Sequence, residues 1–435
     1  MSLSGAVGEL GNPKAWPQVS LRRVLTQSKL ADFPNLPLLG VSLHTGVTRR
    51  LDSDGRPAPS DDLTSYKLVE PDDVIMNRLG KPHGSVGVSP WQGITSPAYW
   101  VMPVDRTIAD PRFMHHLLRS KHMIAEYERL GKNQPPNQFD ISWESFREIE
   151  VPLAPLEEQR RIADFLDAET SRIDRIVDLR RLQVSTLNER YNTAISELVT
   201  PGIASSSERS SKWPWLPANV SVVRLGYLAR VQSGVTVHGA RVVTDDDQEF
   251  PYLRVANVQG ERVDLSEIKT IRIPRTMARS AMLYAGDVVM TEANGNPDNL
   301  GRGAMWDGQI EGMVHQNHVF AIRVDRARLL PEFLTALLAS SHGRRYFRFT
   351  STQVGIATTS SSKVLDFPIP ALSLAKQQKI VDTYARMRDI QLRAVDVLGA
   401  ELELLSERRR ALITAAVTGQ FDVSTASGSN TIQGV

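Results

Sequence analysis

Two long stretches of the chain carry apolar residues at the spacing of an α-helix and predict its dominant elements. The first begins after Pro155, because a residue that precedes proline avoids helical backbone angles. From there to Thr200 the chain contains neither proline nor glycine, and Pro201 and Gly202 end the run. At 1.5 Å per residue, ~44 residues make a helix of about 65 Å. A helix of that length cannot be buried in one small domain, so we expect a rod or one half of a coiled coil.

The second stretch repeats the first. Residues 367–420 align with residues 149–202 without a gap at a single offset of 218. The offset superposes identical residues along the whole segment, among them Gln159 and Gln377. A repeat this long, with its copies this far apart, indicates a duplicated unit. We therefore expect two copies of one architecture, each ending in the same long helix.

Apolar residues also recur every seven positions in both copies, in two registers four residues apart. This heptad pattern is typical of a coiled coil, and pairing of the two helices with each other is the simplest arrangement. Arg180 and Arg409 each interrupt a seam, where a polar residue costs stability and can set the register. The residues predicted to pair the helices are Leu166, Ile173, Arg180, Leu187, Tyr191, Leu398, Leu402, Leu405, Arg409 and Leu412.

The segments that precede the two helices are related more faintly. Residues 68–76 resemble residues 282–290, and each pattern predicts a turn followed by a short β-branched strand. The predicted fold class is mixed α+β, with two α/β domains separated by two long helices that form an antiparallel coiled coil with pseudo-two-fold symmetry. The expected segments are 1–148 and 219–364 for the domains, 149–202 and 365–422 for the helical repeats, 203–218 for a flexible polar linker and 423–435 for a disordered tail.

Composition narrows the class of protein. The 435 residues are 41% apolar and 23% charged, as in ordinary globular proteins. The length suits about two to four domains. Because the net charge is only +2, any nucleic-acid surface must be a local cluster of arginine and lysine. The lack of cysteine excludes disulfides and cysteine–zinc sites. With no apolar run of ~18 residues and no signal peptide, we expect a cytoplasmic protein.

The sequence lacks the motifs that catalysis would need. An adenine methyltransferase tetrad is interrupted in residues 133–137, where Gln134 intervenes and no aromatic residue follows. There is no Walker-type phosphate loop, and the Glu-Ile-Lys string at 267–269 follows Asp264 too closely for a metal-dependent nuclease. The histidine pairs near 115 and 315 lack partners at ligand spacing and are predicted to be surface or hydrogen-bonded residues. We expect a non-catalytic binding protein with no metal site.

The loops of both domains carry side chains suited to reading base edges. Arginine suits guanine and phosphate, and asparagine or glutamine suits adenine. Asparagine and glycine are also ordinary turn formers, so both interpretations stay open at each position. Glycines within 84–87 and 301–304 occupy equivalent places and could permit close approach to phosphate. The candidates are Arg49, Arg50, Asn77, Arg78, Lys81, His83 and Ser85 in the first domain, and Arg254, Asn257, Asn294, Asn296, Asn299, Arg302, Gln316 and Asn317 in the second.

Over nearly its whole length the chain resembles the specificity subunit of type I restriction–modification systems. The resemblance is carried by the repeats at 152–162 and 374–380, together with the strings at 73–75, 84–87 and 94–99. In the second copy the last of these strings is replaced, as expected if the two domains read different sequences.

The resemblance implies that residues 1–148 and 219–364 are target recognition domains, each reading one half of a split double-stranded DNA target. The helices would act as a spacer, and their seam residues would help to dock two modification subunits, which are N6-adenine methyltransferases. S-adenosylmethionine, and ATP and Mg²⁺ for restriction, would be bound by the modification and restriction subunits and not by this chain. Two other hypotheses stay open: the detached recognition part of another restriction–methylation enzyme, or a structural coiled-coil scaffold.

Overall fold

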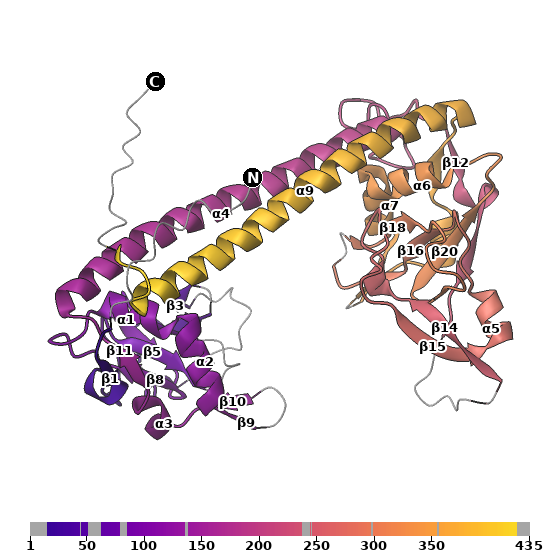
Figure 1. Cartoon of the computed structure of the whole chain (residues 1–435). Coiled ribbons are helices and arrows are strands. Elements are labelled where there is room, and N and C mark those ends of the chain that lie inside the picture. Colours follow the sequence, from indigo (N-terminus) through magenta and orange to yellow (C-terminus); the bar gives the residue numbers. More distant parts are fainter. Residues whose placement is uncertain are drawn as a thin grey trace. The chain divides into compact units, whose positions relative to one another are not determined.

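The computed structural model describes residues 15–43, 45–50, 62–78, 85–134, 138–236, 244, 246–296, 299–354 and 356–423. The chain divides into two compact units. Unit 1 comprises residues 1–180 and 399–435, and unit 2 comprises residues 181–398. Each unit contains one mixed α/β domain and half of each long helix (Figure 1). The predicted fold class is therefore confirmed.

The two predicted long helices are α4 (Leu156–Val199) and α9 (Leu374–Val417), each of 44 residues. α4 begins directly after Pro155, and beyond its end Gly202 adopts a φ of +83°, a left-handed conformation that glycine accepts at little cost. Glu157 and Glu158 lie in the first turn of α4, where their charges favour the helix dipole. α9 has no acidic residue in its first turn.

The halves of the two helices that belong to unit 1 are antiparallel and joined by the two arginines of the seams. Arg180 Nε donates to Glu401 Oε1 at 3.1 Å, and Arg409 Nε donates to Asp174 Oδ1 at 3.0 Å. Between the two contacts the residue number falls along α4 as it rises along α9, which defines the antiparallel direction (Figure 1). Each seam arginine is thus neutralised by a carboxylate of the opposite helix.

The helix pair in unit 2 has the same direction, and Gln391 Nε2 donates to Asn188 Oδ1 at 2.8 Å. Every residue predicted to pair the helices is buried or half-buried: Leu166, Ile173, Arg180, Leu187, Tyr191, Leu398, Leu402, Leu405, Arg409 and Leu412. The helices also carry large apolar side chains that are exposed: Leu179, Leu182, Ile390, Val397 and Leu404.

The domain of unit 1 is built on an antiparallel sheet of order β6-β5-β8, with Phe113, Leu117 and Phe146 in the core beneath it. The sheet strands are β5 (Val74–Asn77), β6 (Val86–Val88) and β8 (Tyr99–Met102). The helices are α1 (Pro111–Leu118), α2 (Lys121–Leu130), α3 (Trp143–Arg147) and the short 3₁₀ helix η2 (Leu21–Arg23). The paired strands outside the sheet are β1 (Gln18–Ser20) with β11 (Glu150–Pro152), β2 (Leu39–Ser42) with β3 (Gly46–Arg49), β4 (Lys67–Val69) with β7 (Gly93–Thr95), and β9 (Lys132–Gln134) with β10 (Gln138–Asp140).

The domain of unit 2 repeats this frame and adds to it. Its main sheet has the order β13-β20-β16-β18, from β13 (Ala229–Ser233), β16 (Val288–Thr291), β18 (Gly303–Met305) and β20 (Val319–Val324). A second sheet holds β14 (Asp247–Leu253), β15 (Lys269–Pro274) and β19 (Val314–His315), and a third holds β17 (Ala293–Asn294), β21 (Thr352–Val354) and β22 (Ile356–Thr358). β12 (Val222–Arg224) pairs with β23 (Pro368–Pro370). The helices are α5 (Arg275–Ser280), α6 (Pro331–Ala339), α7 (Ser341–Thr350) and α8 (Ser361–Leu365), with 3₁₀ helices η3 (Leu225–Tyr227) and η4 (Val255–Asn257).

One buried glutamine at the start of each long helix ties that helix to its domain. The side-chain oxygen of Gln159 accepts from Asp110 N at 2.8 Å, and its nitrogen donates to the carbonyl oxygens of Ile108 and Ala154 at 2.9 and 2.8 Å. Gln377 makes the same three contacts with the corresponding backbone groups of unit 2, at 2.9, 3.0 and 2.9 Å. Gln159 is 0% and Gln377 2% exposed, so both amides satisfy backbone groups that water does not reach.

In unit 2 a single carboxylate holds both long helices against a loop of the domain. Glu261 Oε1 accepts from the hydroxyl of Tyr191 on α4 at 2.5 Å and from the hydroxyl of Tyr384 on α9 at 2.8 Å. Glu261 adopts a φ of +55°, which is uncommon for a residue with a side chain and marks a strained position. Burial, and then the negative charge of Glu261, raises the pKa of both tyrosine hydroxyls.

Residues 203–218, expected to be a flexible linker, belong to unit 2 and pack into it. Ile203, Trp215 and Leu216 belong to its hydrophobic core. Arg209 donates from one guanidinium nitrogen to the carbonyl oxygens of Ile203 and Trp215, at 3.0 and 3.2 Å. The polar composition of residues 203–211 concealed this outcome, since the tryptophans that anchor the segment lie just beyond that stretch.

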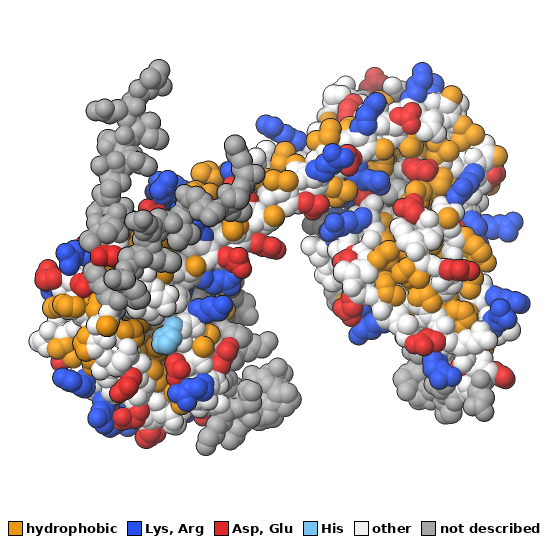
Figure 2. Space-filling model, viewed as in Figure 1, with side chains coloured by type: hydrophobic (Ala, Val, Ile, Leu, Met, Phe, Trp, Pro, Cys, Tyr) orange, Lys and Arg blue, Asp and Glu red, His pale blue; other side chains and the backbone are white. Residues whose placement is uncertain are grey.

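Residues 424–435 lie outside the described residues, so the disordered tail stays a prediction; Val423, the first residue assigned to it, is buried. Within the described part of the chain, none of the helices combines the length and apolar character that crossing a bilayer requires. On the visible face of each unit, basic and acidic side chains are interspersed (Figure 2).

Candidate nucleic-acid interface

In unit 1, three of the predicted DNA-contacting residues meet at one end of the main sheet. Asn77 ends β5 and is followed by Arg78, while Ser85 directly precedes β6. The backbone nitrogen of Asn77 donates to Ser85 O at 2.9 Å, and Asn77 pairs with Tyr99 of β8. Lys81 and His83 lie on the connection between these strands but outside the described residues. The register of the sheet therefore places the β5–β6 connection beside the start of β8, at one edge of the sheet.

The edge of unit 1 is locally basic. Arg78 forms an ion pair with Asp140 at 3.4 Å, and both side chains remain partly accessible to solvent. Lys67, which the sequence did not single out, donates from Nζ to Tyr99 O at 2.6 Å. Burial lowers the pKa of Lys67, and the positive charges of Arg78 and Lys29 add to the shift. Three cations thus lie near one another here, and this is a property of the fold that no local sequence signal records.

Two predicted residues of unit 1 lie away from this edge. Arg49 ends β3, and its guanidinium lies over the ring of Trp91 at 5.4 Å. Trp91 follows the far end of β6, so Arg49 does not join the cluster around Asn77. The backbone nitrogen of Arg50 donates to Leu38 O at 2.8 Å, on the same β2–β3 hairpin.

Unit 2 gathers its candidates at the corresponding end of its main sheet. Thr291, the last residue of β16, donates from its backbone nitrogen to Arg302 O at 3.0 Å and pairs with Val319 of β20. The next residue, Glu292, donates from its backbone nitrogen to His318 O at 2.9 Å. The segments that meet here, β17 and the adjoining loops, carry Asn294, Asn296, Asn299, Arg302, Gln316 and Asn317, all half-buried or exposed.

Polar contacts organise this second edge. The guanidinium of Arg302 donates to the side-chain oxygen of Asn299, and Asn294 Oδ1 accepts from the backbone nitrogen of Asn296 at 3.0 Å. Burial lowers the pKa of Arg302, and the positive charge of Arg344 adds to the shift, so a second cation lies nearby. Sequence reasoning missed Arg344, because it belongs to helix α7 rather than to a loop.

Two further candidates of unit 2 serve its own fold. Asn257 is 4% exposed. Its side-chain oxygen accepts from Arg254 N at 2.9 Å, and its nitrogen donates to the carbonyl oxygens of Asp264 and Glu267 at 2.9 and 3.0 Å. The guanidinium of Arg254 lies 3.3 Å from the carboxylate of Glu267. We leave Asn257 out of the interface, because a buried amide with all its contacts inside the protein has none left for a base.

The two edges are equivalent positions of one repeated sheet. In unit 1, Met76 pairs with Val86 and Trp100; in unit 2, Met290 pairs with Gly303 and Phe320. The loop before β6 in unit 1 and the loop before β18 in unit 2 therefore occupy equivalent positions. The side chains in these places differ, so one frame presents two different surfaces.

The described residues contain no cluster of three His, Asp or Glu side chains that could hold a metal ion. Of the histidines considered in the sequence, His318 is exposed and pairs with Glu292 at 3.1 Å, while the others are buried or half-buried. Burial lowers the pKa of His115 to about 3, and His115 Nδ1 lies 3.2 Å from the backbone nitrogen of Val88. His315 is 0% exposed, and its Nδ1 lies 2.7 Å from Val319 O. Both are hydrogen-bonded, His115 half-buried and His315 in the core.

Comparison with known proteins places this arrangement in context. No protein-family model matches the chain. The specificity subunit of the type I restriction enzyme StySPI from Salmonella potsdam is 22% identical over 334 residues, which cover 74% of this chain and 69% of that protein. The specificity subunit of the type I restriction enzyme EcoKI from Escherichia coli K12 is 25% identical over 257 residues, which cover 56% of this chain and 52% of that protein. The chain is a homologue of type I specificity subunits.

The fold agrees with this relationship. A chain from a structural study of complex assembly and conformational transition of the type I R-M system superposes with a TM-score of 0.67 at 17% identity, over 94% of this chain and 99% of the other. The resemblance predicted from the repeats is therefore confirmed. Because the match to the E. coli specificity subunit spans about half of that protein, the activities and partners of the relatives enter below as proposals.

Proposed function

We propose that this specificity-subunit homologue is the DNA-reading subunit of a type I restriction–modification complex. Each unit reads one half of a bipartite double-stranded target through the loops at the end of its main sheet. The observation that carries the proposal is the repeated edge, which holds Asn77, Arg78 and Ser85 in unit 1 and Asn299 and Arg302, with their neighbours, in unit 2. Arginine and asparagine at the ends of a rigid sheet suit bidentate contacts to guanine and adenine.

The paired helices serve as spacer and as docking platform for two modification subunits. Their seam side chains are occupied with each other, so docking falls to the outward apolar residues. Leu179 and Val397 are equivalent under the 218-residue offset, and they are 59% and 67% exposed. An exposed apolar residue repeated at equivalent positions suits two copies of one partner.

The chemistry resides on the partners. Modification subunits would bring S-adenosylmethionine and methylate adenine, and restriction subunits would bring ATP and Mg²⁺. This chain contributes the choice of sequence, acts without a catalytic residue of its own, and works in the cytoplasm with its DNA.

Methylome sequencing of a host that carries the chain with its modification partner tests the proposal. We expect one bipartite methylated motif, and the purified complex should protect both half-sites in a footprint. Replacing residues 20–148 with the corresponding segment of another specificity subunit should change one half-site and leave the other. Equal binding to random and target duplexes, with no protected bipartite site, would refute the proposal.

The spacer role has its own test. Removing two turns of α4 between Arg175 and Glu189, together with the facing turns of α9, should change the gap between the half-sites or abolish binding. Full-affinity recognition of the original gap would exclude a spacer role for the helices.

A further inference from the structure

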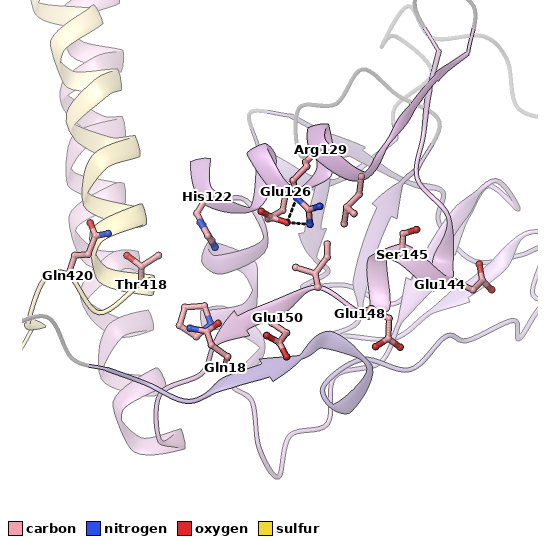
Figure 3. Close-up of a pocket in the computed structure, with 13 residues that line it drawn as sticks. Gln18, His122, Glu126, Arg129, Glu144, Ser145, Glu148, Glu150, Thr418 and Gln420 are labelled. Carbon is pink, nitrogen blue, oxygen red and sulfur yellow. Dashed lines mark hydrogen bonds and ion pairs between the residues drawn. The ribbon is translucent and has the colours of Figure 1, made fainter.

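A groove of about 990 Å³ lies in unit 1 beside the N-terminal strand (Figure 3). Its walls come from α2, α3, the β1–β11 pair and the residues just past the end of α9. Leu130, Ile149 and Pro152 give it an apolar floor, and Glu126, Glu144, Glu148 and Glu150 line it with carboxylates. A volume of this size accommodates a short stretch of polypeptide with one or two large side chains.

The internal repeat identifies the matching place in unit 2. α2 and α7 are both ten residues long, and each begins directly after a serine, Ser120 or Ser340, whose side chain caps the helix. An offset of 220 therefore pairs His122 with His342. It likewise pairs Glu126 with Tyr346 and Arg129 with Phe349.

In unit 2 this place is covered by the chain's own linker. Trp215 Nε1 donates to His342 Nδ1 at 3.0 Å, and its ring lies 5.5 Å from that of Phe349. The ring of Trp213 lies 5.2 Å from that of Tyr346 in an edge-on arrangement. His342 is fully buried as a result, and burial lowers its pKa to about 4. The same surface thus binds an aromatic peptide segment in one of its two copies.

In unit 1 the corresponding helix face is open among the described residues. His122, the equivalent of the buried His342, is exposed and lines the groove together with Glu126 and Glu150 (Figure 3). Glu126 also bonds Arg129 on the same helix at 2.8 Å. Glu126 thus stands where unit 2 has Tyr346, and together with Glu144, Glu148 and Glu150 it gives the lining four carboxylates against one arginine, Arg129. This excess of negative charge shifts the preference of the site toward a positively charged ligand.

We propose that this groove binds a basic, aromatic-bearing peptide segment of a partner protein, in the way that unit 2 binds its own linker. The linker itself shows the chemistry, since Arg209 and Lys212 closely precede its two tryptophans, Trp213 and Trp215. The ends of the chain do not match it: residues 1–14 contain one lysine, one glutamate and no aromatic residue, and residues 424–435 contain neither charge nor aromatic ring. Neither segment carries the basic and aromatic residues of the linker, so we assign the groove to a segment of another protein.

The test uses a fluorescent peptide with the sequence of residues 209–217 and the full-length chain, followed by fluorescence anisotropy. In unit 2 the linker covers its own site, so the peptide reports on the groove of unit 1. We expect saturable binding that weakens as salt is raised. The double charge reversal Glu126→Lys with Glu150→Lys should weaken binding at least tenfold. Glu128→Lys on the same helix, outside the groove lining, should leave binding unchanged.

Three results would overturn the proposal: no saturable binding, equal loss of affinity in the Glu128→Lys control, or binding that appears only after residues 1–14 or 424–435 are removed. The last result would mean that an end of this chain fills the groove. A peptide in which both tryptophans are replaced by alanine should not bind, and its binding would reduce the effect to general electrostatic attraction. These measurements need no DNA, so they stand or fall separately from the proposed recognition of DNA.

Discussion

Replacing Gln159 with leucine should strongly destabilise unit 1, because it removes three hydrogen bonds at once from a site without solvent. The change leaves the backbone nitrogen of Asp110 and the carbonyl oxygens of Ile108 and Ala154 without their amide partner. An unsatisfied buried polar group costs about 1–3 kcal/mol, and carbonyl oxygens with a second lone pair fall at the lower end. The sum is roughly 3–5 kcal/mol of unfolding free energy. For a unit of this size, that corresponds to a fall in Tm of about 6–20 °C.

Differential scanning calorimetry and urea unfolding of the full chain measure this loss. The repeat supplies a replicate, since Gln377→Leu should have the same effect on unit 2. It also supplies a matched control: Gln378, the next residue, is exposed and bonds Asp382 at 2.8 Å. Gln378→Leu should change stability by less than about 0.5 kcal/mol. If the unfolding free energy of Gln159→Leu differed from that of the unchanged protein by less than about 0.5 kcal/mol, the argument that these glutamines hold the helices to the domains would fail.

Four other predictions concern individual side chains. Glu261→Ala should lower the unfolding free energy of unit 2 by about 2 kcal/mol, because the hydroxyls of the half-buried Tyr191 and the buried Tyr384 lose their acceptor. Urea unfolding measures this loss. Tyr191 and Tyr384 have raised pKa values, so their contribution is present below pH 10 and is lost as pH rises further; alkaline unfolding of a double Tyr→Phe variant should be less steep. The pKa of His342 is lowered to about 4, so unit 2 should lose stability as pH falls from about 6.5 toward 4, and His342→Gln should remove that part of the acid sensitivity. Arg302→Ala should relax recognition of one half-site by about 1–3 kcal/mol while the other half-site keeps its selectivity in binding assays with mutated duplexes.

The long helices could be predicted from the sequence because their signals are local. Proline and glycine mark the ends of α4, heptads mark its paired face, and the repeat extends both conclusions to α9. The burial of Leu166, Ile173 and Leu398 agrees with that reading. The strands after Asp73 and Asp287 were found in the same way, from turn residues followed by β-branched runs.

The candidate interface could be predicted only in part, because its geometry depends on residues far apart in the chain. Asn77 and Ser85 meet through strand register, which no single loop encodes. Asn257 looks like a base-reading residue in the sequence, yet its amide closes a turn inside the protein. Lys67 reaches the basic edge because its strand, β4, pairs with β7, which lies far along the chain. The tryptophans of the linker can be recognised as anchors only when their partners on α7 are known.

The two units share the same backbone arrangement, but different side chains hold the domain to the long helices in each unit. The glutamine contacts at the helix starts are the same in both units, which indicates that duplication preserved the way a domain joins its helix. The contacts beyond that joint differ: in unit 1, Arg112 and His116 of α1 bond Asp167 of α4, whereas in unit 2 Glu261 bonds a tyrosine from each helix. If each domain reads its own half-site, as proposed above, both properties are needed, because the spacing between half-sites requires a constant joint while each domain must be free to change its loops. The contacts beyond the joint have diverged, while the glutamine contacts are unchanged. This is the pattern expected if selection acts separately on two recognition surfaces.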